Sequence, residues 1–323
     1  MSKTRKVFKD FVIKNIALTE EQLQVLEEAA KHGTYVETLS NKADGLHINV
    51  KEYEPEHVTR LFSNQAKNLI RKQRVGLVDL ICDVTSEDFY GKVEGLYIYP
   101  WTGEEGVKGK YHYFVAGILF RNKIIPFYLA ILRIGSSMAE HIGKAIRLCQ
   151  SSGLKIGKVL LDRGFYSGEV INSIKAEKTN YLIFVPKKQL FKCMLEGTER
   201  SVIVEHDMKY NKDFTKKKAS TNIVLVKDFY DYDWVFATNL SLPNIAMHVR
   251  LYRKRWNIET MFRVHDEARI KSKSKVPVIR LFYFVISMLL LLIWNLFAKS
   301  KMTFKLFIIR LSEDATWGIK SSS

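Results

Sequence analysis

The sequence predicts an α/β fold, and two observations carry this prediction. Segments with the pattern of strand, strand, strand, helix and strand follow one another at residues 75–85, 111–120, 123–135, 138–153 and 158–162. A helix between the third and fourth strands implies a parallel crossover, so the first and fourth strands can lie side by side. Asp83 and Asp162 then both lie at carboxyl ends of strands, where α/β sheets commonly build their sites.

The composition favours a polyanionic partner. The chain has 323 residues, of which 47 % are hydrophobic and 12 % aromatic, enough for a sizeable core. Its formal net charge of +17 indicates nucleic acid first and an anionic membrane surface second. The cysteines Cys82, Cys149 and Cys193 are widely spaced, and no apolar segment follows the basic N-terminus. We therefore expect a cytoplasmic protein without a signal peptide.

Residues 1–75 are expected to form a helical N-terminal region. Thr19 has the position of an N-cap and Gly33 that of a helix stop, which predicts a helix over residues 18–33. A second helix is expected from Pro55 to about Gln73, and its basic end can be a solvated helix end or a phosphate contact. A role of this region in binding DNA ends is inferred from its charge alone.

Residues 175–240 interrupt the alternation of strands and helices. Short strand-like runs at 181–186, 200–206, 222–230 and 234–240 predict an inserted antiparallel sheet rather than a continuation of the core. The segment 209–218 is expected to be a lysine-rich turn, in which Lys216, Lys217 and Lys218 either contact DNA or are solvated. Trp234 is expected in the core of the insertion, with stacking on an unpaired base as the alternative.

Residues 248–271 are expected to form one helix. Tyr252, Arg255, Glu259 and Arg263 are spaced three, four and four residues apart and therefore share a face. Arginines one turn before and one turn after Glu259 would hold its carboxyl group ionised. An ion-paired surface helix is the alternative, which the apolar residues around this face disfavour.

Residues 281–297 are apolar on almost every side. At 1.5 Å per residue the run is about 25 Å long. A membrane span requires roughly 20 residues, or about 30 Å, so the run is too short. We expect a buried core helix, with a membrane span as the alternative. Residues 301–323 are expected to form a C-terminal tail.

Three acids, Asp83, Asp162 and Glu259, are the candidates for a metal site. Three carboxylates that converge from separate elements repel one another unless a divalent cation neutralises them. Oxygen ligands select Mg²⁺ or Mn²⁺ over zinc. Two such ions can activate a nucleophilic oxygen and stabilise the leaving oxygen of a phosphodiester. The sequence contains no GxxxxGK[ST] motif, which argues against ATP use.

Three stretches resemble the DDE transposases of prokaryotic insertion sequences, in the group with a Tyr-Arg-Glu-Lys signature. They are ICDVTSEDFYGK (81–92, with Asp83, Thr85, Tyr90 and Gly91), LLDRGFYS (160–167) and LYRKRWNIETMFR (251–263). The resemblance covers about residues 75–300. It implies a ribonuclease-H-like catalytic core over residues 76–300, with an antiparallel β insertion at about 175–240.

One position departs from the commonest signature. That pattern has a lysine seven residues after the glutamate, where this chain has Asp266. A branch rich in archaeal elements instead has an arginine four residues after it, which is Arg263 here, and we favour that branch. Asp266 is a rival third acid, but the spacing from Tyr252 and Arg255 favours Glu259.

The resemblance implies a metal-dependent transposase. Asp83, Asp162 and Glu259 would be the catalytic residues and would hold two Mg²⁺ ions, which Mn²⁺ can replace. Water would free a 3′-hydroxyl at the element's end, and this hydroxyl would then attack target DNA, in some relatives after a hairpin step.

The same resemblance implies the partners. Tyr252, Arg255 and Arg263 would contact phosphates near the cleaved end. The partners would be double-stranded DNA of the terminal inverted repeats and of the target, bound by a homodimer in the nucleoid, with no membrane. A nuclease of the same fold that does not join strands, and a DNA-binding relative without catalysis, are the alternatives.

Overall fold

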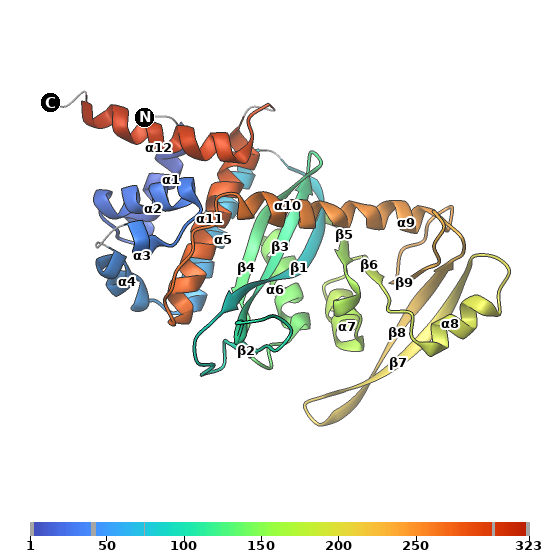
Figure 1. Ribbon diagram of the computed structural model, residues 1–323. Helices are drawn as coiled ribbons and strands as arrows, with labels where there is room; N and C mark the ends of the chain where they lie inside the picture. The colour runs from blue at the N-terminus through green and yellow to red at the C-terminus, as the bar shows by residue number, and fades with distance from the viewer. Residues whose placement is uncertain (1–2, 40–42, 74, 299–300, 321–323) are drawn as a thin grey trace.

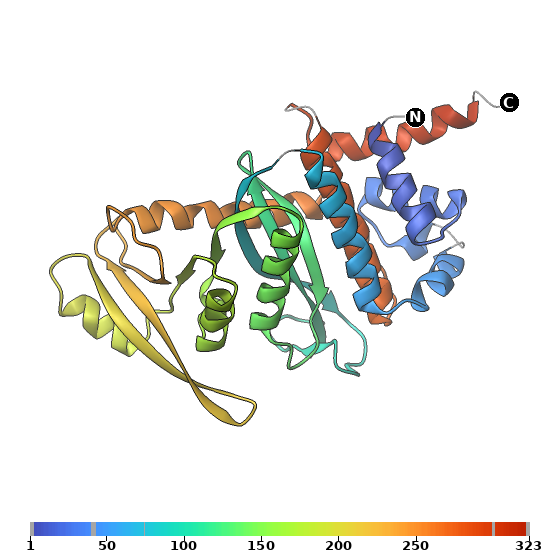
Figure 2. The ribbon, with the colours of Figure 1, turned by 180° about the vertical axis from the view of Figure 1, so that it is seen from behind.

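The computed structural model describes residues 3–39, 43–73, 75–298 and 301–320. The molecule is elongated. The helices of the N-terminal and C-terminal segments lie at one end, a β-sheet lies in the middle, and a long β-ribbon lies at the other end (Figure 1). The view from behind shows the same arrangement, with the first and last helices side by side (Figure 2).

One mixed sheet of nine strands runs through the described part of the chain. Its order is β2-β3-β1-β5-β6-β9-β8-β7, and β4 also pairs with β3. The strands are β1 (Leu77–Phe89), β2 (Tyr99–Pro100), β3 (Gly109–Phe120), β4 (Lys123–Ile131), β5 (Lys155–Leu161), β6 (Tyr181–Phe184), β7 (Val202–Lys212), β8 (Thr215–Val226) and β9 (Trp234–Thr238).

Helices pack on the sheet and against one another. They are α1 (Lys3–Asp10), α2 (Glu20–His32), α3 (Val36–Leu39), α4 (Ala43–Lys51), α5 (Pro55–Arg71), α6 (Met138–Ser151), α7 (Gly168–Ala176), α8 (Gln189–Glu196), α9 (Met247–Tyr252), α10 (Trp256–Asp266), α11 (Pro277–Phe297) and α12 (Phe304–Lys320). Helix α6 packs on β3, β4 and β5, whereas α5 and α11 pack on each other and on β4. Figure 2 shows α6 in front of the strands that hide it in Figure 1.

The predicted core of the α/β fold is confirmed. β1 and β5 are parallel neighbours, with Cys82 opposite Leu161, so Asp83 and Asp162 follow at adjacent positions. Leu80, Ile81 and Cys82 are fully buried in succession, as the apolar run predicts. The predicted end of β1 at Asp83 is wrong, because β3 continues to pair with β1 as far as Phe89.

The prediction of a separate inserted sheet is also wrong. β6 pairs with β5 in parallel and with β9 in antiparallel, so β9, β8 and β7 extend the core sheet. The predicted lysine-rich turn is mostly strand. β7 and β8 stay paired as far as Lys212 and Thr215, and only Asp213 and Phe214 form the turn. Both turn residues have positive φ angles, 49° and 60°, which the two-residue turns of tight hairpins require.

The predicted helices of the N-terminal region are present. Thr19 caps α2 and forms a capping box with Gln22, and Gly33 ends the helix with a φ of 61°. Helix α5 begins at Pro55, whose fixed φ suits the first helical turn.

Two segments near the C-terminus are helical. Helix α11 is long and apolar enough to cross a membrane, but 89 % of its most apolar window is buried inside the fold, as expected for a core helix. Part of the segment expected as a tail forms α12, which packs on α2. Residues 321–323 of that segment lie outside the described residues.

The single helix predicted over residues 248–271 is wrong. A 3₁₀ turn, Arg253–Arg255, separates α9 from α10, and α10 ends at Asp266. Lys271 instead forms a parallel bridge with Tyr35, and the following residues form neither helix nor strand until α11 begins. Pro277 is one reason, because it disfavours a helical conformation at the preceding residue, Val276.

Candidate active site

Asp83 and Asp162 lie next to each other where β5 ends. Asp83 is on β1, and Asp162 directly follows β5 with an extended backbone. Each carboxylate accepts a hydrogen bond from the next backbone N–H: Asp83 Oδ1 from Val84 at 2.8 Å and Asp162 Oδ1 from Arg163 at 2.6 Å. These bonds hold both side chains at the carboxyl end of β5.

Arg255 joins Asp83 to Glu259. Its guanidinium group contacts Asp83 Oδ2 at 3.3 Å and Glu259 Oε1 at 2.5 Å. Arg255 is only 5 % exposed, whereas more than half of the Glu259 side chain is in solvent. The buried cation therefore draws a carboxylate on α10 toward the two on the sheet.

Tyr252 completes the polar cluster. Its hydroxyl group donates to Asp162 Oδ1 at 3.2 Å and accepts from Arg255 Nε at 3.0 Å. The ring packs against Phe184 and Phe236 of the sheet, which holds it in place. The 3₁₀ turn after α9 puts Arg255 three residues on, close enough to reach the hydroxyl.

Burial has the largest effect on the pKa of Asp83. Burial, together with the nearby charges of Asp162 and Glu259, raises the pKa of Asp83 from 3.8 to about 6. The Val84 N–H and the Arg255 charge oppose that rise in pKa without cancelling it. A further cation would thus stabilise the ionised site.

The donor set fits a hard divalent cation. Asp83, Asp162 and Glu259 offer only carboxylate oxygens, the ligands that Mg²⁺ and Mn²⁺ prefer. No group of three His, Cys, Asp or Glu side chains in the described ranges is close enough to form a ready metal site. Here the Arg255 guanidinium group contacts two of the acids and supplies the compensating charge.

Asp266, the rival third acid, lies elsewhere. It is within 3.5 Å of His265 and Arg269, at the far end of α10. Glu259, by contrast, is among the charges that raise the pKa of Asp83. The geometry therefore supports Glu259 as the third acid.

The residues predicted to contact DNA fall into three places. Tyr252 and Arg255 are buried within the acid cluster rather than on the surface. Arg263 is exposed one turn beyond Glu259 and has no charged partner in the part of the chain that the structure describes. Lys216, Lys217 and Lys218 are exposed on β8, outside the acid cluster.

Trp234 packs as the core interpretation predicts. Its ring stacks on Phe236 and meets Tyr252 edge-on, with centroids 6.0 and 6.4 Å apart. Its Nε1 donates to the Phe229 carbonyl at 2.9 Å. Trp234 thus supports the aromatic wall behind Tyr252.

Residues 135–294 match a protein family described as "Transposase DDE domain". This part of the chain, just under half of it, is thus similar to the transposase DDE domain. The matched range includes Asp162 and Glu259 and begins after Asp83. No curated protein sequence matches the chain.

The fold of the chain is similar to that of a piggyBac transposase in a synaptic complex with hairpin DNA. The TM-score is 0.56, with 12 % sequence identity over 86 % of this chain and 60 % of that chain. At this identity the likeness concerns the fold alone. The chain thus spans about 60 % of the length of that transposase.

One charged cluster at the far end of β1 from the acid cluster was missed by the sequence analysis. Lys271, Lys273 and Lys275 lie on the extended segment after α10, next to Glu87 of β1. The alternation of lysine and serine from 271 to 275 is a strand-like signal that could have revealed them. The predicted helix over 248–271 obscured it.

Proposed function

We propose that the protein is a DNA transposase that cuts phosphodiester bonds at the ends of an insertion sequence and joins the 3′-hydroxyl ends to target DNA. The observation that carries this proposal is the linkage of Asp83, Asp162 and Glu259, from three separate elements, through the side chains of Arg255 and Tyr252. The transposase DDE domain family supports it independently.

Asp83, Asp162 and Glu259 are the residues that would hold two Mg²⁺ ions. When bound, these ions would supply the charge that activates the attacking oxygen and stabilises the leaving oxygen. Hydrolysis breaks the bond between phosphorus and the 3′-oxygen at the element's end and frees a 3′-hydroxyl. In strand transfer this hydroxyl forms a new ester with a target phosphate, and the target's own 3′-oxygen leaves.

Side chains around the acids organise them for this work. Arg255 orients the carboxylates of Asp83 and Glu259, because its guanidinium donors reach both. The Tyr252 hydroxyl fixes one oxygen of Asp162 through a hydrogen bond. Together they would hold the ligand oxygens in place before DNA arrives.

Exposed cations around this site would bind the DNA. Arg263 would contact phosphates near the cleaved end, one turn beyond Glu259 on α10. The lysines of β8, Lys216, Lys217 and Lys218, would contact the duplex farther away, and the helical region 1–75 would bind the element's ends. Since two ends must be joined, we propose a homodimer on DNA that acts in the nucleoid.

The finer classification follows from the same residues. We place the protein in the Tyr-Arg-Glu-Lys signature group on Tyr252, Arg255 and Glu259. Arg263, four residues after Glu259, supports the branch rich in archaeal elements. The position seven residues after Glu259, where the commonest signature has a lysine, is Asp266 here.

The decisive test is cleavage of a labelled duplex that carries the DNA flanking the element, in Mg²⁺ or in EDTA. We expect metal-dependent nicking at the repeat end and joining to a supercoiled target. Asp162→Ala should lose both reactions but keep DNA binding, while Asp266→Asn serves as the matched acid control. Nicking without joining would favour the nuclease. Binding without nicking in Mg²⁺ or Mn²⁺ would favour the inactive relative.

A further inference from the structure

A cavity of about 500 Å³ lies beside the acid cluster, at the far ends of β1 and α10. Among the residues that line it are Tyr35, Tyr90 and three lysines, Lys271, Lys273 and Lys275. We propose that these three lysines form a second binding surface for duplex DNA, which holds phosphates beyond the cleavage site. This inference rests on the proposed function and names a DNA-binding surface that the proposal above does not include.

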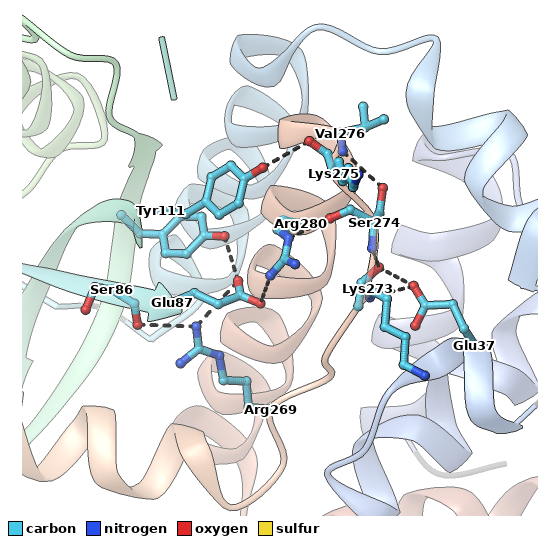
Figure 3. A network of polar contacts seen from close by, with 12 residues as sticks. Glu37, Ser86, Glu87, Tyr111, Arg269, Lys273, Ser274, Lys275, Val276 and Arg280 are labelled. Atoms are coloured by element: carbon cyan, nitrogen blue, oxygen red, sulfur yellow. Dashed lines mark hydrogen bonds and ion pairs between the residues drawn. The ribbon is translucent and has the colours of Figure 1, made fainter. Parts of the chain in front are cut away.

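The segment that carries the lysines is held rigidly in an extended form. Val36 N–H donates to the Lys271 carbonyl at 3.0 Å, and Lys271 N–H donates to the Thr34 carbonyl at 3.1 Å. Glu37 accepts from Ser272 Oγ at 2.5 Å and from the Lys273 N–H at 2.8 Å (Figure 3).

The end of the segment is fixed as well. The Tyr111 hydroxyl donates to the Lys275 carbonyl at 3.0 Å, and Arg280 donates to the Ser274 carbonyl at 2.7 Å. Such a backbone loses little conformational freedom when a ligand binds, which favours affinity.

The lysines project away from these anchors. Ser272 is buried, whereas Lys271, Lys273 and Lys275 are exposed, so the segment alternates like an edge strand. Lys271 and Lys273 pass the Tyr35 ring, with Nζ 6.0 and 5.7 Å from its centroid. In Figure 3 the Lys273 side chain extends away from the polar network below Ser274.

The three lysines have no acidic partner in the described residues, although acids line the same cavity. Glu87 is paired with Arg280 at 2.8 Å and with Arg269 at 3.6 Å. Asp88 is paired with Lys110 at 3.3 Å, and Asp266 with Arg269 at 3.5 Å. Since the protein compensates its own carboxylates here with other cations, the lysine charges are left for an external anion.

The position relative to the acids indicates a duplex rather than a small anion. Asp83 and Glu87 project from the same face of β1, four residues and about 13 Å apart. That span is less than half a helical turn of B-DNA, about 17 Å. One duplex can therefore reach the acids and the lysine row together, and three spaced cations suit a row of phosphates.

The test measures the salt dependence of duplex binding by the full chain. The variant carries Lys271→Gln, Lys273→Gln and Lys275→Gln, all at exposed positions. The control carries Arg121→Gln, Lys155→Gln and Lys178→Gln. These exposed positions lose the same charge near the opposite ends of the central strands. Fluorescence anisotropy with a labelled duplex gives the dissociation constant at NaCl concentrations from about 50 to about 300 mM. The slope of log affinity against log salt concentration follows from these values.

We expect the slope of log affinity against log salt concentration to fall by about 0.9 for each phosphate that the lysine-row variant no longer neutralises. The control should keep the wild-type slope, and both variants should keep the wild-type melting temperature. Equal slopes for the two triple variants, with wild-type binding intact, would overturn the lysine row but leave the transposase proposal standing. A wild-type chain that binds no duplex at any salt concentration would overturn both.

Discussion

The hydroxyl group of Tyr252 donates a hydrogen bond to Asp162 Oδ1 at 3.2 Å, which joins the end of α9 to the end of β5. The two residues are 90 positions apart in the chain. The same hydroxyl accepts from Arg255, so the position of Asp162 is coupled to the cation that contacts Asp83 and Glu259. A change in this one oxygen should therefore affect the whole acid cluster.

Tyr252→Phe removes that oxygen while keeping the aromatic packing. We expect cleavage to fall by about fivefold and the Mg²⁺ concentration for half-maximal cleavage to rise, because one hydrogen bond of about 1 kcal/mol no longer orients Asp162. Tyr166→Phe is the matched control, since its buried hydroxyl has no hydrogen-bond partner among the described residues. An unchanged Mg²⁺ requirement in Tyr252→Phe would contradict the positioning role.

Glu259→Gln and Asp266→Asn separate the two candidates for the third acid. Replacing Glu259 should lower the cleavage rate on the order of 10²-fold or more, because a charged group at the reacting centre is removed. Replacing Asp266 should leave the rate within a few-fold, because Asp266 pairs with His265 and Arg269 instead. Single-turnover cleavage with both variants would decide which residue is the third acid. A larger loss of rate in Asp266→Asn than in Glu259→Gln would identify Asp266 instead.

The raised pKa of Asp83 makes the stability of the metal-free protein depend on pH. Burial raises the pKa of this carboxyl from 3.8 to about 6, so the folded state keeps a proton that the unfolded state has released. The free energy of unfolding should therefore decrease as pH rises from about 4 to about 6, by at most about 3 kcal/mol.

The comparison with Asp83→Asn isolates this contribution. Glu27 titrates in the same direction, because burial raises its pKa to about 7, so wild type alone would not separate the two acids. Urea unfolding at pH 4, 5, 6 and 7 should show a shallower decrease in the variant. Parallel curves for the two proteins would show that Asp83 has an ordinary pKa.

Arg280→Met tests the ion pairs beneath the cavity. Arg280 is 7 % exposed in its side chain and contacts Glu87 at 2.8 Å, so its removal leaves a half-buried carboxylate with only Arg269 and the Tyr113 hydroxyl. We expect a loss of about 3 kcal/mol in the free energy of unfolding. Lys92→Met, which breaks the exposed pair with Glu94, should cost less than about 1 kcal/mol. Similar costs for both would mean that Glu87 is solvated.

The β8 lysines are tested by Lys216→Gln, Lys217→Gln and Lys218→Gln together. We expect weaker duplex binding and a salt slope that is smaller by about 0.9 for each phosphate that these lysines neutralise in wild type. Lys218 already pairs with Asp207 at 2.7 Å, so the change in slope should be closer to that of two phosphates than of three. A wild-type slope in this variant would mean that these lysines are only solvated.

The central strands could be predicted because their signals are local. The apolar runs that became β1, β3, β4 and β5, and the caps at Thr19 and Gly33, each need only a few neighbouring residues. The parallel pairing of β1 and β5 followed from the helix between them, and with it the proximity of Asp83 and Asp162.

The rest depended on interactions between distant segments. The strand end expected at Asp83 was overridden by pairing with β3, and the helix expected at Lys271 by pairing with Tyr35. The place of Arg255 between Asp83 and Glu259 required the 3₁₀ turn after α9, which no residue pattern marks. Spacing therefore predicted the pair of Arg255 and Glu259, which the structure confirms, but not the contact of Arg255 with Asp83.

The single sheet has a mechanical consequence. β5, which ends at Asp162, is joined to the ribbon of β7 and β8 through β6 and β9 by continuous backbone hydrogen bonds. The ribbon cannot swing as a separate body without breaking those bonds. The fold thus fixes the distance between the acids and the tip of the ribbon, where Phe214 is fully exposed to solvent. A ligand that contacts the tip would therefore be held at a constant distance from the acid cluster.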